Sequence, residues 1–278
     1  MGEYISPPCI LPLSRPAVRM VILALDTTTP KGSVALVRHG ELVTAVTGDA
    51  TRTHGERLPG DLIALLDSQS LRLSDVDGFA VCSGPGSFTG LRVGLATIQA
   101  LALVNNRSVV PVPTLEALAW AALWHTGDAP RRHLVGAWMN AHRGEVFAAL
   151  YHCPPDLDDR PDHTRWRPLD VALPPTVGRP DAIAEQLHEH SSGADTPMTV
   201  IGDAVEATRD ILDAVLGPST QLVTDVPPLA AVAGRIAHTI FEDQGAIIPH
   251  AVHPVYVRRP DAELARDRRR LKADASEE

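Results

Sequence analysis

The sequence is poor in cysteine, in basic residues and in long apolar runs. Its three cysteines, Cys9, Cys82 and Cys153, include no pair at CxxC spacing. This excludes a disulfide framework and a cysteine-rich zinc site, and it favours a reducing, cytoplasmic location. Lys and Arg number 25 against 34 Asp and Glu, which gives a net charge of -9. The chain therefore lacks the large basic surface with which a protein grips nucleic acid on its own.

No apolar run is long enough to span a membrane, and we expect no membrane association. The longest candidate, residues 91–104, is interrupted by Arg92 and Gln99, and it falls short of the roughly 18 apolar residues that a spanning helix needs. Residues 1–19 hold four prolines, and their arginines lie near the end of the stretch. A signal peptide has its positive charge at the start and an apolar middle, so this stretch does not resemble one. We interpret 1–19 as a disordered extension, and we hypothesise that translation starts at Met20, directly before a strand-like run.

The rest of the chain has the composition of a globular protein, with 44% hydrophobic and 21% charged residues. Alternating apolar residues predict strands, and apolar residues at helical spacing predict helices. In the first half we expect strands at 21–26, 33–38, 41–47, 76–82 and 109–112. We expect three helices: one that follows the Thr53–Glu56 capping box, one at 88–104, and one that Thr114 caps and that ends at 124. The order is β-β-β-α-β-α-β-α.

The second half repeats this order. We expect strands at 133–139, 145–151, 167–173, 198–201 and 221–223, helices at 181–190, 203–216 and 228–243, and a Pro-rich loop across most of 153–180. The duplication predicts an α/β fold of two lobes, each a mixed sheet with flanking helices, stacked across a cleft. The first lobe would span 20–112 and the second 113–244, with the helix at 228–244 packing on the first lobe. Residues 245–278 would form a C-terminal segment with a charged tail.

Two stretches could meet phosphate oxygens. Asp26-Thr27-Thr28 follows a strand, and its hydroxyl and N–H groups suit either a phosphate or an ordinary capped strand end. The stretch from Gly84 to Gly94 leads into a helix whose N-terminus favours anions, but it matches neither the dinucleotide fingerprint nor a Walker loop. Gly90 and Gly94 are four residues apart, a spacing that would let another helix approach closely.

The sequence argues against a metal centre and against ATP-dependent chemistry. Leu58 stands four residues after His54, so the His-x-x-x-His pair of a helix-borne metal site is missing. Where a second-lobe carboxylate would help to hold Mg-ATP, the polar turn offers the neutral Asn140. A glycine-rich clasp for adenosine is not evident, since the chain has no Gly-Gly dipeptide.

Four segments, 21–29, 53–58, 84–92 and 254–260, resemble the TsaB (YeaZ) family of the actin-like, sugar-kinase and Hsp70 superfamily. The resemblance implies two actin-like, ribonuclease H-like lobes and a non-catalytic scaffold. That scaffold would pair with TsaD, together with the ATPase TsaE, for transfer of a threonylcarbamoyl group to the adenosine next to the anticodon of tRNA. It implies no intrinsic cofactor, with ATP and metal on TsaD and TsaE, and contact with tRNA only through the complex.

The resemblance also assigns residues to roles. The TsaD-pairing surface, which could also form a homodimer, would comprise His54, Arg57, Leu58, Leu62 and Leu65 on one helix and Leu91, Arg92, Leu95 and Ile98 on the next. A vestigial phosphate site would comprise Asp26, Thr27, Thr28, Gly84 and Gly86. The alternatives are an active ATP-dependent phosphotransferase of the same superfamily and a metalloprotease.

Overall fold

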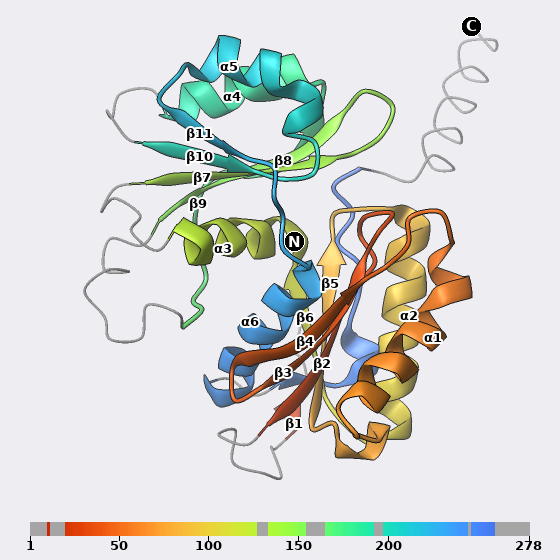
Figure 1. The fold of residues 1–278 in the computed structure, drawn as a ribbon. Helices are drawn as coiled ribbons and strands as arrows, with labels where there is room; N and C mark the ends of the chain where they lie inside the picture. Colours follow the sequence, from red (N-terminus) through yellow and green to blue (C-terminus); the bar gives the residue numbers. More distant parts are fainter. Residues whose placement is uncertain are drawn as a thin grey trace, which may run out of the picture.

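The computed structural model describes residues 10–11, 20–126, 133–153, 165–191, 197–243 and 246–258, which form two lobes built on two mixed β-sheets (Figure 1). In the first lobe the order is β2 (Val21–Asp26), β3 (Ser33–Arg38), β4 (Glu41–Thr47), α1 (His54–Ser68), η2 (Leu73–Asp75), β5 (Gly78–Gly84), α2 (Phe88–Val104), β6 (Val109–Pro113) and α3 (Thr114–Thr126). The second lobe repeats it with β7 (Leu134–Asn140), β8 (Val146–His152), β9 (Asp170–Gly178), α4 (Pro180–Ser191), β10 (Met198–Ile201), η3 (Glu206–Thr208), α5 (Arg209–Leu216), β11 (Thr220–Val223) and α6 (Leu229–Asp243). The repeat confirms the predicted fold class.

The first sheet is buried on both faces. Its strand order is β1-β12-β6-β5-β2-β3-β4, and β2 pairs antiparallel with β3 and parallel with β5. Because side chains alternate along a strand, Leu23 and Leu25 of β2 pack under α1 and α2, while Ile22 and Ala24 pack under α6. This double burial explains why β2 reads as a continuous apolar run rather than an alternating one.

Helices α1 and α2 begin and end where the sequence predicts, whereas α3 differs at both ends. The Glu56 side chain accepts hydrogen bonds from both the N–H (2.8 Å) and the hydroxyl (2.7 Å) of Thr53, which fixes the start of α1. Ser87 caps α2 by accepting from the N–H of Gly90, and Asn106 takes the left-handed conformation just after the helix, at φ 50°. Thr114 does not cap α3, since it is the first helical residue and its hydroxyl accepts instead from the N–H of Gly84.

The second sheet has the order β11-β10-β7-β8-β9, and two predictions are corrected there. The strand predicted at 167–173 is found as β9, but it begins at Asp170 and continues to Gly178 through two consecutive prolines that were predicted as loop. Proline cannot donate to a β-ladder and is tolerated at a sheet edge, and β9 is an edge strand. The helix predicted at 203–216 is α-helical only from Arg209 and is preceded by the 3-10 turn η3, where the Thr208 hydroxyl accepts from the indole N–H of Trp138 (2.9 Å) and donates to the carbonyl of Ala204 (2.8 Å).

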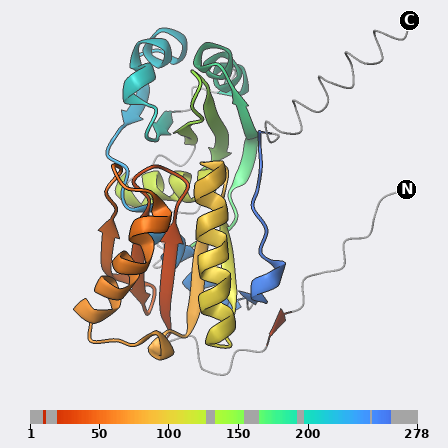
Figure 2. The same cartoon turned by 90° about the vertical axis from the view of Figure 1, so that its right-hand side faces the viewer.

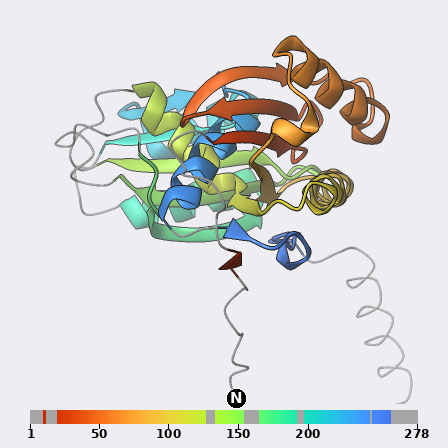
Figure 3. The same cartoon turned by 90° about the horizontal axis from the view of Figure 1, so that it is seen from below.

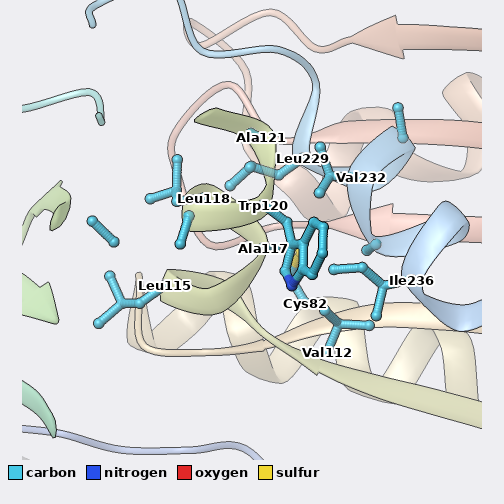
Figure 4. Packing of buried hydrophobic residues seen from close by; sticks show 14 of the residues in the cluster. Cys82, Val112, Leu115, Ala117, Leu118, Trp120, Ala121, Leu229, Val232 and Ile236 are labelled. Atoms are coloured by element: carbon cyan, nitrogen blue, oxygen red, sulfur yellow. The ribbon is translucent and has the colours of Figure 1, made fainter. Parts of the chain in front are cut away.

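Helices α3 and α6 lie between the two sheets and join the lobes. Helix α3 contacts strands of both sheets, and α6 lies against α3 and the strands of the first sheet. Trp120 of α3 is fully buried among Cys82, Val112 and Ile236, in a cluster that also takes in apolar residues of β7 and β8 (Figure 4). The lobes therefore share one continuous core.

The two ends of the chain are described only in part. Ile10 and Leu11 form β1 and pair antiparallel with β12 (Ala246–Ile247), so the interpretation of 1–19 as disordered does not hold for these two residues. The rest of 1–19 and the charged tail from 259 lie outside the described residues. After β12 comes the short turn η4 (Pro249–Ala251), which Gln99 of α2 holds by donating to the carbonyls of Pro249 (3.0 Å) and Val252 (2.9 Å) (Figure 3).

Two helix glycines provide a matched test of this packing. A Cβ at Gly90 of α2 would lie 2.1 Å from the carbonyl oxygen of Thr27, whereas a Cβ at Gly60 of α1 would meet nothing within 4 Å. We expect Gly90→Ala to lower the free energy of unfolding by about 2–4 kcal/mol through overpacking, and Gly60→Ala to raise it by about 0.5–1 kcal/mol through helix propensity. Urea unfolding followed by circular dichroism measures both, and equal stability of the two variants would contradict this packing.

Candidate functional site

A cavity of about 490 Å³ lies at the junction of the lobes, beside the turn between β2 and β3. Its wall includes Asp26 and Thr29 from that turn, Lys31, and Asp203 and Asp225 from the second lobe. Carboxylates thus outnumber the cation on this wall, and their field opposes the entry of a phosphate that brings no cation of its own.

Asp26 is buried and closely partnered within the chain. Its Oδ1 accepts from the N–H (2.9 Å) and the hydroxyl (2.6 Å) of Thr28. Burial raises the pKa of the carboxyl above its ordinary value, the hydrogen bonds from Thr28 oppose that rise, and the neighbouring charge of Asp203 adds to it. Burial likewise raises the pKa of the Cys82 thiol beside it. At a given pH, the neutral form of the Asp26 carboxyl is therefore more populated than that of an exposed aspartate.

The other predicted phosphate-site residues serve the packing of the first lobe. Thr27 is fully buried and points at Gly94, and its hydroxyl has no hydrogen-bond partner among the described residues. Thr28 packs so closely on Gly86 that a Cβ there would lie 2.5 Å from the Thr28 Cβ. Gly84 donates to Thr114. Of the five residues predicted for this site, only Asp26 lines the cavity.

The turn of the second lobe also faces the junction. The backbone N–H of Asn140 donates to Oδ1 of Asp203 at 2.9 Å, and the Asn140 side chain accepts from the N–H of His142. Burial raises the pKa of Asp203, and the bond from Asn140 opposes the rise. The sequence reading missed Lys31, Asp203 and Asp225 of this cavity. For Asp203 no signal was present, because no local motif marks a carboxylate that holds a turn 63 residues away.

His54 and Arg57, predicted at the pairing surface, brace the β2–β3 turn instead. The Nε2 of His54 lies 3.0 Å from the carbonyl oxygen of Thr29, and Arg57, only 3% exposed, bonds the carbonyl of Lys31 and pairs with Asp61. Burial and the Arg57 charge lower the pKa of His54. Neutral His54 and the buried guanidinium therefore fix one wall of the cavity.

The predicted pairing surface is corrected in a second respect. Its apolar members lie in the core between the helices and the first sheet, at 0 to 7% exposure: Leu58, Leu62, Leu65, Leu91, Leu95 and Ile98. Gly90 and Gly94, predicted as a groove for a partner helix, pack against Thr27. Helices α1 and α2 do lie side by side on one face of the sheet (Figure 2), and the predicted Arg92 is exposed on α2, but the large apolar residues that the two helices expose are different ones. Ile63 on α1 is 60% exposed, and Leu103 and Val104 at the end of α2 are 58% and 83% exposed.

The C-terminal segment ties the two lobes together on the α2 side (Figure 2). The N–H of Val255 donates to the carbonyl of Ser83 at 2.7 Å in the first lobe. In the second lobe, Arg258 donates to the carbonyl of Ala141 at 2.7 Å and pairs with Glu145. The sequence reading noted these residues as part of a motif but had no signal for their role, because the contacts join segments more than 110 residues apart.

The described residues offer no evident metal centre. Among them, no three His, Cys, Asp or Glu side chains lie where they could hold a metal ion together. No helix in the described part of the chain has the length and apolar character that a membrane crossing requires.

The raised pKa of Asp26 has a consequence for stability. A carboxyl whose pKa is higher in the folded than in the unfolded state contributes stability below its ordinary value of 3.8, and that contribution is lost as the pH rises. We expect Asp26→Asn, which cannot ionise, to remove this loss, so that its stability relative to the parent chain increases between about pH 4 and pH 7. Urea midpoints across that range measure the difference. Asp67→Asn, an exposed site on α1, is the control, and parallel pH profiles for parent and Asp26→Asn would contradict the assignment.

Comparison with known proteins places the chain in a family. Residues 46–263 match the family model described as TsaD, tRNA N6-adenosine threonylcarbamoyltransferase. The chain is 30% identical over 243 residues to the tRNA threonylcarbamoyladenosine biosynthesis protein TsaB of Escherichia coli, covering 86% of this chain and 95% of that protein. It is 32% identical over 173 residues to TsaB of Haemophilus influenzae, covering 62% of this chain and 70% of that protein. The structure of YeaZ from Pseudomonas aeruginosa superposes with a TM-score of 0.65 at 26% identity, covering 85% of this chain and 99% of that one. The chain therefore belongs to the TsaB (YeaZ) family, which is related to the TsaD transferases.

Proposed function

We propose that this chain is a non-catalytic scaffold that pairs with TsaD in the biosynthesis of threonylcarbamoyladenosine in tRNA. Family membership supports the pathway. The observation that carries the scaffold role is the outward face of α1 and α2, which exposes large apolar side chains on a chain of net charge -9. Exposed apolar residues grouped on one face are typical of a protein interface.

The outward face has the shape that helix packing needs. On α2 it combines the exposed small residues Ala96 and Ala100 with Leu103, and on α1 it combines Gly60 and Ala64 with Ile63. Small residues let a partner helix approach, and larger ones fill its grooves. A similar pair of helices on TsaD, or on a second copy of this chain, would complete a four-helix contact.

In this proposal the chemistry belongs to the partners. ATP and metal would be held by TsaD and TsaE, and tRNA would be contacted through the assembled complex. The neutral Asn140 supports this division, since it leaves the β7–β8 turn without the carboxylate that a Mg-ATP site would use there.

The pairing face can be tested by adding charge to it. We expect Ile63→Glu and Ala100→Glu each to weaken binding to purified TsaD at least about tenfold, because a charge desolvated in an apolar contact is costly. Threonylcarbamoyladenosine in cellular tRNA should fall in parallel. Pull-down with tagged TsaD and nucleoside analysis by mass spectrometry measure the two effects.

Val171→Glu is the matched control, since Val171 is a 48% exposed apolar residue on β9 of the other lobe. It should leave pairing and modification unchanged. Full TsaD binding by both helix variants, with parental melting temperatures, would refute the surface. Charges at Leu62 or Leu95 would not be informative, because both side chains belong to the core.

The phosphotransferase alternative makes a separate prediction. We expect the isolated chain to show no steady turnover of Mg-ATP with or without small hydroxyl acceptors. Steady ATP turnover that Asp26→Asn abolishes would contradict the non-catalytic assignment, because it would place working chemistry at the junction of the lobes.

A further inference from the structure

A second cavity at the lobe junction differs in charge from the one beside Asp26. It measures about 360 Å³ and lies beyond the end of β5, between the start of α2, the β7–β8 turn and the C-terminal segment. Arg143 and Arg258 line it, and none of the described residues that line it is acidic. Arg258 is paired with Glu145 and Arg143 is exposed in the β7–β8 turn, so Arg143 is the cationic side chain that this wall presents to solvent on a chain of net charge -9.

Aromatic rings form the other part of the wall. Phe88 and Tyr256 have ring centroids 5.2 Å apart and are 38% and 37% exposed. Arg92 stacks on Phe88 with its guanidinium carbon 3.9 Å from the ring centroid, and its Nε donates to the Tyr256 hydroxyl at 3.3 Å. These contacts hold both rings at the cavity instead of letting them pack into the core. A planar ligand could stack there, as nucleic acid bases stack on exposed aromatic side chains.

The start of α2 adds backbone donors to the same wall. Phe88 and Thr89 lie in the first turn of α2, where the helix itself supplies no acceptor for their N–H groups. The partial positive charge of a helix N-terminus favours an anion at this position. The cavity thus combines cations and N–H donors with aromatic faces.

The turn that presents Arg143 adopts unfavourable backbone conformations. His142 and Arg143 have φ of 58° and 59°, a region that side chains other than glycine, asparagine and aspartate seldom occupy. Gly144 follows at 75°. Positive φ at Arg143 and Gly144 is what a tight hairpin turn requires, so the turn fixes the place of Arg143 on the cavity wall, and strained residues gather at binding sites.

We propose that this cavity binds a nucleotide, with the base stacked on Phe88 and Tyr256 and the phosphate held by Arg143 and the start of α2. The shared chemistry is a planar base carrying a phosphate, which either a free mononucleotide or an unpaired nucleotide of single-stranded RNA provides. The ATP-site position beside Asp26 is a different cavity, and the proposal does not depend on the pairing with TsaD.

The test uses the isolated full-length chain and isothermal titration with AMP, adenosine, inorganic phosphate and a short single-stranded RNA. We expect saturable binding of AMP, with adenosine and phosphate each at least about tenfold weaker because each satisfies half of the site. RNA that displaces AMP and binds more tightly would identify a strand nucleotide as the natural ligand. RNA that cannot displace AMP would identify a free nucleotide.

Arg143→Gly separates binding from folding. Glycine removes the charge and suits the left-handed backbone, so the variant should keep or raise the melting temperature while weakening AMP binding at least about tenfold. Phe88→Leu, which keeps apolar bulk but removes the aromatic face, should weaken AMP binding without unfolding the chain. His39→Gly, at φ 56° in the β3–β4 turn and outside the cavity, is the matched control and should bind AMP as the parent does.

The proposal would be overturned if AMP showed no saturation by about 10 mM, or if Arg143→Gly and Phe88→Leu both bound AMP with parental affinity. The AMP titration uses no TsaD, and the pull-down with TsaD uses no AMP, so each experiment tests one of the two proposals. The two proposals can therefore fail separately.

Discussion

The structure depends on the burial of two sheets against one shared layer of helices. Helices α3 and α6 lie between the sheets, and Trp120 fills the space among Cys82, Val112 and Ile236 with no exposure to solvent. Fully burying an aromatic side chain of this size contributes about 2–3 kcal/mol. Because the same cluster includes residues of both sheets, a rigid rotation of one lobe against the other would break core contacts. The width of the junction is thus set mainly by the core, and the segment with Val255 and Arg258 fastens its outer side.

The junction of the two lobes contains two cavities that differ in electrostatic character. One is lined by Asp26, Asp203 and Asp225, and the carboxyls of Asp26 and Asp203 accept hydrogen bonds from within the chain. The other is lined by Arg143 and Arg258 together with aromatic rings. The overall charge of -9 therefore says little about what each part of the junction attracts.

Much of the fold could be predicted from sequence because its signals are local. The Thr53–Glu56 capping box, the Ser87 cap and the apolar strand runs each act within a few residues, and all appear where expected. The errors come from effects that act over a distance. The prolines of β9 favour a loop in the sequence, because only the sheet topology shows that this strand lies at an edge. The 3-10 turn before Arg209 contacts Trp138, 70 residues away, which local sequence does not show.

The predictions for the functional site failed for the same reason, since local sequence does not show what a residue packs against. Periodicity correctly identified the apolar stripe of α1, but an apolar stripe alone does not reveal whether it faces the chain's own sheet or a partner. Burial of Leu62 and Leu95 decides this in favour of the sheet. In the proposed scaffold, folding and association would use opposite faces of the same two helices. Substitutions at Ile63 or Leu103, which lie largely in solvent in the single chain, can then change the affinity for a partner while leaving the core intact. An association surface that is separable from the core in this way can be altered with little cost in the free energy of folding, since exposed substitutions usually change it by less than about 0.5 kcal/mol.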